Sequence, residues 1–253
     1  MKPPAEPEPW AALAALTPAR VALGRAGASM PTREVLAFAL DHARARDAVH
    51  IPFDAAGVAR QVESLDLETL QVESAAADRA TYLRRPDLGR RLAPESRARL
   101  VQHPRAEPDV LVIVADGLSS IAVHAHAAPL LRALTPHATA QGWRLGPIVL
   151  AHQARVALGD EIGALLGARF VVLLVGERPG LSSADSLGAY LTFAPRVGRS
   201  DAERNCVSNI RPAGLSYDDA AARIAWHVGE SLRRGYSGVA LKDESASGRL
   251  AAS

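Results

Sequence analysis

The sequence predicts an α/β protein: a Rossmann-like parallel sheet with helices on both faces, preceded by a helical N-terminal subdomain. From residue 108 onward, short and almost continuously apolar runs alternate with helical patterns, as in parallel sheets that helices cover on both sides. Before residue 108, apolar residues recur at helical spacing and no strand pattern is evident. The 253 residues suffice for one large domain or for a core domain with a smaller helical unit.

We expect residues 1–105 to form the helical N-terminal arm or subdomain. Residues 11–16 read as a helix and are followed by Thr17-Pro18, a cap-then-proline pair that starts helices. Pro31-Thr32 with Glu34 opens a further helix, whose apolar positions fit a period of 3.6. The proline-rich residues 1–9 are expected to be disordered.

The second domain is expected to span residues 106–243. Its predicted strands are 109–115, 147–151, 169–175 and 189–193, and its predicted helices are 119–134, 159–166 and 216–234. The loops after the first three strands meet at the carboxyl edge of a parallel sheet, where ligands of such folds bind. The small polar residues 244–253 are expected to be a disordered tail.

Two loops carry unusual chemistry. Residues 176–180 read Gly-Glu-Arg-Pro-Gly directly after a predicted buried strand, and glycines there let backbone amides approach a ligand. By spacing alone, Glu177 either contacts such a ligand or pairs with an arginine such as Arg178. Residues 201–212 form a second polar loop, with Cys206, the only cysteine, in its middle. Such a cysteine is usually a small buried hydrophobic residue.

Other candidate residues favour structural roles. Asp116 follows a predicted strand and either faces a ligand or starts a turn, and the turn is favoured because Asp-Gly is a turn dipeptide. Ser119 lacks a Gly-x-Ser-x-Gly elbow, which leaves a hydrolase using Asp116 and Ser119 as a weak hypothesis. His124 and His126 point about 200° apart on a helix. The other histidines show no HExxH-type grouping, so no metal site and no catalytic residue are predicted.

Composition narrows the function classes further. Hydrophobic residues make up 48% and charged residues 22%, as in ordinary globular proteins. No apolar run approaches the roughly 18 residues of a membrane helix. Residues 1–10 lack a basic start followed by an apolar run, so we expect no secretory signal. A single cysteine cannot form an internal disulfide, which favours a reducing cytoplasm.

The positive charge is concentrated in one segment. Eight arginines lie between Arg79 and Arg105, against the two acids Asp87 and Glu95. With Tyr82 as the one aromatic residue able to stack on a base, the segment is poorly suited to nucleic acid. A protein contact and a solvated surface remain the two interpretations, and the contact is preferred because arginine is enriched at interfaces.

Several long strings resemble one known family. They include VIVADGLSS (112–120), GERPGLSSADSLG (176–188) and SDAERNCVSNIRP (200–212). These strings, in the same order, are similar to the small subunits of ethanolamine ammonia-lyase, and the resemblance runs from residue 17 to about residue 243. Such a set is more specific than a single glycine-rich motif.

The resemblance implies a function. Ethanolamine ammonia-lyase depends on adenosylcobalamin, is a hetero-oligomer, and converts ethanolamine to acetaldehyde and ammonia by radical chemistry. The resemblance implies that the large subunit holds the substrate and that this chain helps to bind the cofactor. The positions matching the family's cobalamin contacts are Val156, Glu177 and Cys206. Ethanolamine breakdown is often housed in a bacterial microcompartment, which is an alternative location to the open cytoplasm.

Other cofactors are disfavoured by missing motifs. No G-x-G-x-x-G follows the first predicted strand, which argues against NAD or FAD. The Asp-x-His-x-x-Gly signature of proteins that place a histidine on cobalt is also missing, so the cofactor's own dimethylbenzimidazole is expected to stay on the metal. The alternative function is a non-catalytic regulatory module that binds a nucleotide-like small ligand.

Overall fold

The computed structural model describes residues 16–17, 19–21, 23–104 and 107–245. The strands are β1 (Thr69–Glu73), β2 (Val110–Ala115), β3 (Ile148–His152), β4 (Phe170–Gly176), β5 (Leu187–Phe193) and β6 (Arg204–Ile210). The α-helices are α2 (Thr32–His50), α3 (Ala55–Glu63), α4 (Arg79–Arg84), α5 (Pro94–Gln102), α6 (Ser120–Ala140), α7 (Leu158–Leu165) and α8 (Tyr217–Arg234). Short 3₁₀ turns cover Leu88–Arg90 and Asp201–Glu203. The predicted helix at 11–16 (except residue 16), the disordered start at 1–9 and the tail from residue 246 lie outside the described residues.

The strands form one mixed sheet in the order β1-β3-β2-β4-β5-β6. The first four are mutually parallel, whereas β5 runs antiparallel to both β4 and β6. The α/β class is therefore confirmed, but the prediction of an all-parallel sheet was wrong. Residues 177–186 contain no helix to carry the chain across the sheet, and without such a crossover the chain returns alongside β4 in the opposite direction.

The seven elements predicted after residue 108 are all present, six of them within two residues of their expected bounds, whereas α6 runs six residues beyond its expected end, to Ala140. Two strands were missed, β1 and β6, and the expectation of no strand before residue 108 was wrong. Both lie at the edges of the sheet, and each mixes buried residues with half-buried and exposed ones instead of being continuously apolar. The division at residue 105 stays a prediction, although β1 joins this sheet.

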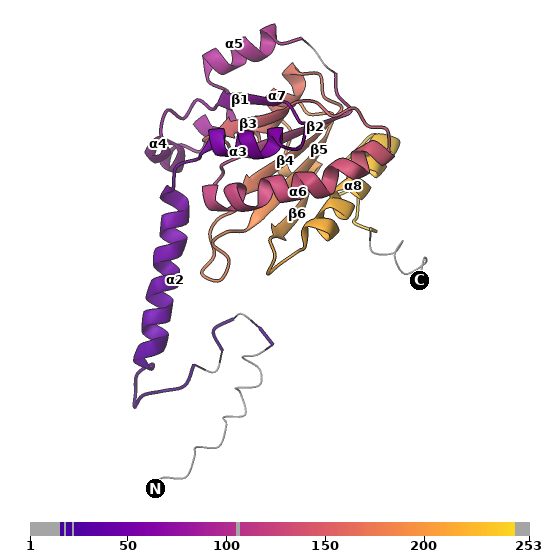
Figure 1. Cartoon of the computed structure of the whole chain (residues 1–253). Helices are drawn as coiled ribbons and strands as arrows, with labels where there is room; N and C mark the ends of the chain where they lie inside the picture. Colours follow the sequence, from indigo (N-terminus) through magenta and orange to yellow (C-terminus); the bar gives the residue numbers. More distant parts are fainter. Residues whose placement is uncertain (1–15, 18, 22, 105–106, 246–253) are drawn as a thin grey trace.

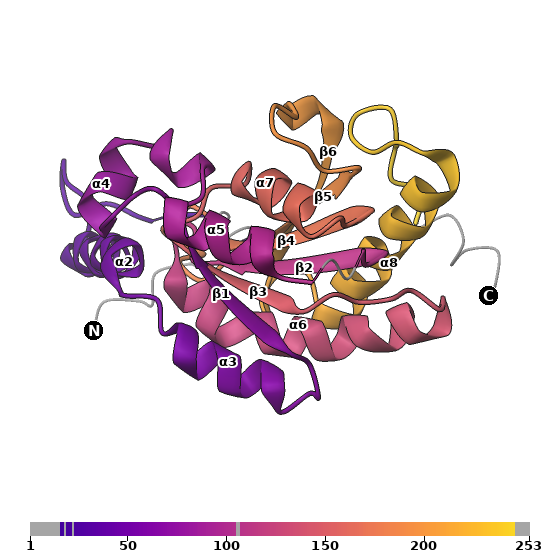
Figure 2. The same ribbon diagram turned by 90° about the horizontal axis from the view of Figure 1, so that it is seen from above.

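Helices cover both faces of the sheet, as predicted (Figure 2). Along β2, Val110, Val112 and Val114 pack with α3, α6 and α8, while the intervening residues pack with α5 and α7. The chain thus leaves β2 toward one face, through α6, and leaves β3 toward the other, through α7. Diverging exits of this kind leave a crevice at the carboxyl ends of the strands.

Helix α2 projects away from this body (Figure 1). Ala48 is its one buried residue, and Leu36 is 64% exposed. Further exposed apolar side chains on the helix are Val35, Phe38 and Leu40. Among the described helices, none has the length and apolar character needed to cross a membrane.

Candidate functional site

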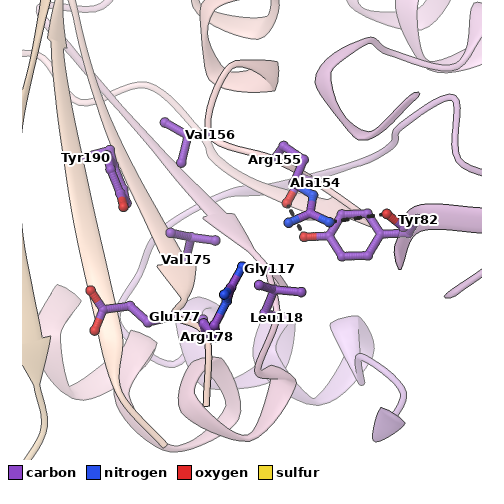
Figure 3. A pocket seen from close by; sticks show the side chains of 11 residues that line it. Tyr82, Gly117, Leu118, Ala154, Arg155, Val156, Val175, Glu177, Arg178 and Tyr190 are labelled. Atoms are coloured by element: carbon purple, nitrogen blue, oxygen red, sulfur yellow. Dashed lines mark hydrogen bonds between the residues drawn. The ribbon is translucent and has the colours of Figure 1, made fainter. Parts of the chain in front are cut away.

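A cavity of about 420 Å³ lies at the carboxyl ends of β2, β3 and β4 (Figure 3). We call it the strand-end cavity. It is lined by Tyr82, Gly117, Leu118, Ala154, Arg155, Val156, Val175, Gly176, Glu177, Arg178 and Tyr190. Most of these residues belong to the loops that follow the three parallel strands, the loops in which the sequence predicted ligand contacts.

Asp116 holds two of these loops together. Its buried carboxylate accepts hydrogen bonds from the backbone N–H groups of Gln153 (3.0 Å) and Ala154 (3.1 Å). The Arg79 guanidinium lies 3.5 Å from the same carboxylate. Burial raises the pKa of Asp116, whereas the two N–H donors and Arg79 oppose the rise. The structural role favoured from sequence is confirmed, and Asp116 fixes the loop after β3 to the end of β2.

Glycines allow the loops after β2 and β4 to touch. Gly117 has φ +57°, and the Leu118 N–H donates to the Gly176 carbonyl oxygen at 2.8 Å. A Cβ on Gly176 would overlap the Ser119 carbonyl group. The glycine at 176 is therefore required by contact between the two loops, and not only by access for a ligand as predicted.

The Glu177 side chain lies across β5. Its Oε2 accepts a short hydrogen bond from the Ser186 hydroxyl and one of 3.3 Å from the Asn209 N–H. Gly188 leaves the space for this position, because a Cβ there would lie 2.8 Å from Glu177 Oε1. The partners of Glu177 are thus a hydroxyl and a backbone N–H rather than Arg178. A carboxylate held in place at a cavity wall is suited to accept hydrogen bonds from a ligand.

Val156 and Cys206 are both associated with Tyr190, the first through a shared cavity and the second through strand pairing. Val156 lines the strand-end cavity with Glu177. Cys206 is outside the lining, but it pairs with Tyr190 across β5 and β6. Although the Cys206 residue is exposed, shielding of its sulfur by neighbouring atoms, followed by the Glu177 charge, raises the pKa of the thiol to about 11. The same kind of shielding, followed by the nearby Cys206, raises the pKa of Tyr190 to about 12.

The loop between β4 and β5 is anchored to two helices. His126 contacts the Tyr217 hydroxyl through Nδ1 (2.9 Å) and Asp185 through Nε2 (3.3 Å). Ser119 caps α6, and its hydroxyl donates to the Ala184 carbonyl oxygen at 2.8 Å. Ser119 is fully buried in this role, which leaves the hydrolase hypothesis without an accessible nucleophile.

His124 and His126 point apart, as predicted. His126 contacts Tyr217 and Asp185, whereas His124 accepts the backbone N–H of Asp54 at 2.9 Å. Across the described ranges, no three His, Cys, Asp or Glu side chains gather in a group that could hold a metal ion.

Sequence reasoning missed the wall formed by Tyr82 and Arg155. Tyr82 is fully buried, and its hydroxyl donates to the Ala154 carbonyl oxygen at 3.1 Å. The guanidinium carbons of Arg155 and Arg79 lie 4.2 and 4.8 Å from the centre of the Tyr82 ring. Figure 3 shows Tyr82 and Arg155 on the side of the cavity opposite Glu177. The sequence signal was Tyr82 itself, the single aromatic residue in the arginine-rich segment.

A second cavity, of about 400 Å³, adjoins the first. We call it the arginine cavity, and it is lined by Pro86, Arg90, Arg155, Val156, Ala157, Tyr190, Arg199, Ser200 and Asp201. It shares Arg155, Val156 and Tyr190 with the strand-end cavity, so the two cavities lie next to each other.

The chain is similar to proteins of one family over nearly its whole length. The family model described as ethanolamine ammonia-lyase light chain matches residues 7–242. A protein of Azotobacter vinelandii (strain DJ / ATCC BAA-1303), named ethanolamine ammonia-lyase small subunit, is 56% identical over 98% of this chain and 93% of its own length. Proteins of the same name from Pseudomonas putida KT2440 and Ralstonia nicotianae GMI1000 are each 56% identical, over 95% and 93% of this chain and 90% and 88% of their own lengths.

The Cys206 thiol offers a direct test of the geometry around Glu177. Because the thiolate is the reactive form, alkylation of Cys206 by iodoacetamide should keep accelerating up to about pH 10, as a pKa of about 11 requires. The variant Glu177→Gln removes a negative charge that disfavours the thiolate, so the pKa should fall. Alkylation at pH 9 should then be roughly two- to tenfold faster. The exposed variant Glu95→Gln should leave the rate unchanged, and a plateau near pH 9 in the unmodified chain would contradict the arrangement.

Proposed function

The chain belongs to the ethanolamine ammonia-lyase light-chain family, and we propose that it helps to bind adenosylcobalamin while a large subunit holds the substrate ethanolamine. As a family member it is a subunit of a hetero-oligomeric carbon–nitrogen lyase. The proposed overall reaction yields acetaldehyde and ammonia. Adenosylcobalamin, when bound, supplies the radical chemistry, and the protein supplies binding, orientation and exclusion of water.

The observation that carries the proposal is the convergence of three distant positions. Val156 and Glu177 line one cavity at the carboxyl ends of β3 and β4, and Cys206 lies beside it against Tyr190. These positions were inferred from family resemblance, without knowledge of the fold. Their meeting on one surface supports a shared ligand and is not required by packing alone.

The dimensions and chemistry of the cavities fit part of a cobalamin. Each cavity falls at the lower end of the roughly 300–1,000 Å³ that accommodates a drug-sized ligand. A corrin with its amide side chains and nucleotide arm is larger than such a ligand. The cavities combine apolar walls with backbone groups, one fixed carboxylate and several guanidinium groups, which suits the amides and the phosphodiester of the cofactor. This chain would therefore hold one portion of it and leave the rest to the large subunit.

Each predicted contact then has a distinct role. Val156 would pack against an apolar edge of the ligand, and the Glu177 carboxylate would accept hydrogen bonds from amide side chains. Cys206 would contribute through its backbone, because it lies outside the lining of both cavities and pairs with Tyr190 along β5 and β6. No histidine is among the described residues that line either cavity.

The Rossmann-like comparison and the location in the cell are parts of the same proposal. Strands β2, β3 and β4 deliver their loops to one carboxyl edge, as in nucleotide-binding sheets, and this arrangement supports the comparison. A single cysteine supports a cytoplasmic location, with the interior of a bacterial microcompartment as the alternative.

We further propose that α2 docks on the large subunit. Its exposed apolar side chains have no covering element in the described structure, and its length is about 28 Å at 1.5 Å per residue.

The arginine-rich segment is a weaker candidate for contact with the large subunit than its composition indicated. Several of its arginines are engaged internally, including Arg85 with Asp87 and Arg97 with Glu161. Arg105 lies outside the described residues.

Reconstitution tests the function as a whole. The chain co-purified with the large subunit should bind adenosylcobalamin, seen in its visible spectrum, and should form acetaldehyde, followed by coupled alcohol dehydrogenase. The chain alone should form none, because its cavities contain no grouping of base, nucleophile and metal ligand. Acetaldehyde formation by the isolated chain would contradict the assignment. Tight binding of a nucleotide by the isolated chain, without any cobalamin binding by the complex, would favour the regulatory module.

Replacing Glu177 should weaken cofactor binding selectively. A lost hydrogen bond to a carboxylate costs about 1.5–3 kcal/mol, so Glu177→Ala should raise the Kd for adenosylcobalamin roughly ten- to a hundredfold. The apparent affinity for ethanolamine should hardly change, since the substrate lies in the other subunit. Glu68→Ala makes the same change at the opposite end of the sheet, at the start of β1, and should have no effect. An unaltered cofactor Kd for Glu177→Ala would return this residue to a structural role.

The docking of α2 can be tested with one charge. Leu36→Asp should weaken assembly with the large subunit at least roughly tenfold, because it would bury a carboxylate in an apolar contact. The isolated chain should retain its unfolding midpoint, since Leu36 is exposed there. Val239→Asp is the matched control, an equally drastic change at an aliphatic residue that is 78% exposed and remote from α2. Size-exclusion chromatography with light scattering gives the readout, and normal assembly by Leu36→Asp would place the interface elsewhere.

A further inference from the structure

The lining of the arginine cavity carries more positive than negative charge, and Glu203, which is not part of the lining, pairs with one of its arginines, Arg199. Three guanidinium groups line it, those of Arg90, Arg155 and Arg199, against one carboxylate, Asp201. The Asp201 side chain is 98% exposed, and its carboxylate lies 3.6 Å from the guanidinium of the buried Arg204. Arg204 is not part of the cavity lining. Asp201 is therefore poorly placed to compensate the cavity arginines.

The three arginines differ in how firmly they are held. Arg199 is fixed by Glu203 and by two backbone carbonyl groups, and Arg155 is stacked on Tyr82. The Nε of Arg155 is buried and has no hydrogen-bond partner. Arg90 is exposed, and in the described part of the chain its guanidinium makes no hydrogen bond or ion pair. The cavity thus combines two positioned cations with one that is free to close on a ligand.

This arrangement selects for a particular ligand chemistry. Arginine presents a planar set of donors that matches phosphate oxygens in pairs. Helix α7 starts next to Val156 and Ala157, but Asp160 and Glu161 in its first turn offset its positive end, so the arginines supply the positive charge of the cavity. The first N–H groups of the helix are already used in tight turns, for example Leu158 N–H to the Arg155 carbonyl oxygen at 2.9 Å.

We propose that the arginine cavity binds a phosphate group, with Arg90 closing on it. Two sources can supply that group: the phosphodiester in the nucleotide arm of cobalamin, and a free phosphate or nucleotide. The first source rests on the proposed function. It is favoured because the two cavities share Arg155, Val156 and Tyr190 in their linings, so one large ligand bound at this edge of the sheet would contact both.

Three forms of the cofactor separate the phosphate from the rest of the ligand. Adenosylcobalamin carries phosphate and base, adenosylcobinamide phosphate carries the phosphate without the base, and adenosylcobinamide carries neither. Their Kd values would be measured by spectral titration of the complex with the large subunit, for the unmodified chain, Arg90→Gln and Arg91→Gln. Arg91 is the matched control, an exposed neighbour that lines neither cavity.

Arg90→Gln should raise the Kd for both phosphate-bearing forms roughly five- to fiftyfold and leave adenosylcobinamide unchanged. Arg91→Gln should change none of the three. Equal weakening of all three forms by Arg90→Gln, or no weakening of any, would overturn the placement of the cofactor's phosphate. Failure of the unmodified complex to bind any corrinoid would instead overturn the proposed function.

Calorimetry of the isolated chain with inorganic phosphate and with 5′-AMP distinguishes the second source. Binding that is lost in Arg90→Gln, together with an unchanged Kd for adenosylcobalamin, would support a phosphate site that serves a free ligand. Absence of binding by both probes, with an unchanged cofactor Kd in Arg90→Gln, would overturn the phosphate site altogether.

Discussion

The buried carboxylate of Asp116 is the contact on which the shape of the strand-end cavity depends. It lies at the end of β2, accepts two N–H groups of the loop after β3, and faces Arg79 from α4. A carboxylate with little access to water is costly unless such donors surround it, so each partner is held firmly in turn. Tyr82 holds the same loop from the other side through the Ala154 carbonyl oxygen. The backbone around Val156 is therefore positioned by the protein before any ligand arrives.

Topology explains why this position remains open. The crossovers after β2 and β3 leave on opposite faces, and the loop after β4 turns back into a hairpin, so no helix covers the carboxyl edge between them. The contact between Gly117 and Gly176 draws two of the loops together at this side of the cavity. A cavity of about 420 Å³ with fixed walls can hold one portion of a ligand as large as cobalamin.

Much of the fold could be predicted from sequence because the central strands are buried on both faces and read as uninterrupted apolar runs. The edge strands could not be predicted in the same way. In β6 the buried Arg204 is neutralised by Asp160, 2.6 Å away on α7, so a charged residue occupies an interior position that only the tertiary structure reveals. The same limit applied to the site. Glu177 was identifiable from its loop, whereas Arg155 and Arg90 acquire meaning only when folding brings them to Val156 and Tyr190.

A cofactor shared between two chains would link its own affinity to their assembly. A ligand that binds the assembled complex more tightly than the separate chains raises the association constant of the two chains by the ratio of its two affinities. Arg79 provides a physical connection within this chain, because its Nε donates to the Val49 carbonyl oxygen at the end of α2 (2.7 Å) and its Nη1 to the Gly117 carbonyl oxygen at the cavity wall (2.8 Å). One guanidinium therefore contacts both the proposed docking arm and the proposed ligand site. The end of α2 and the loop at Gly117 are thus held by the same side chain, so the proposed docking of α2 and the proposed binding of the cofactor both depend on Arg79.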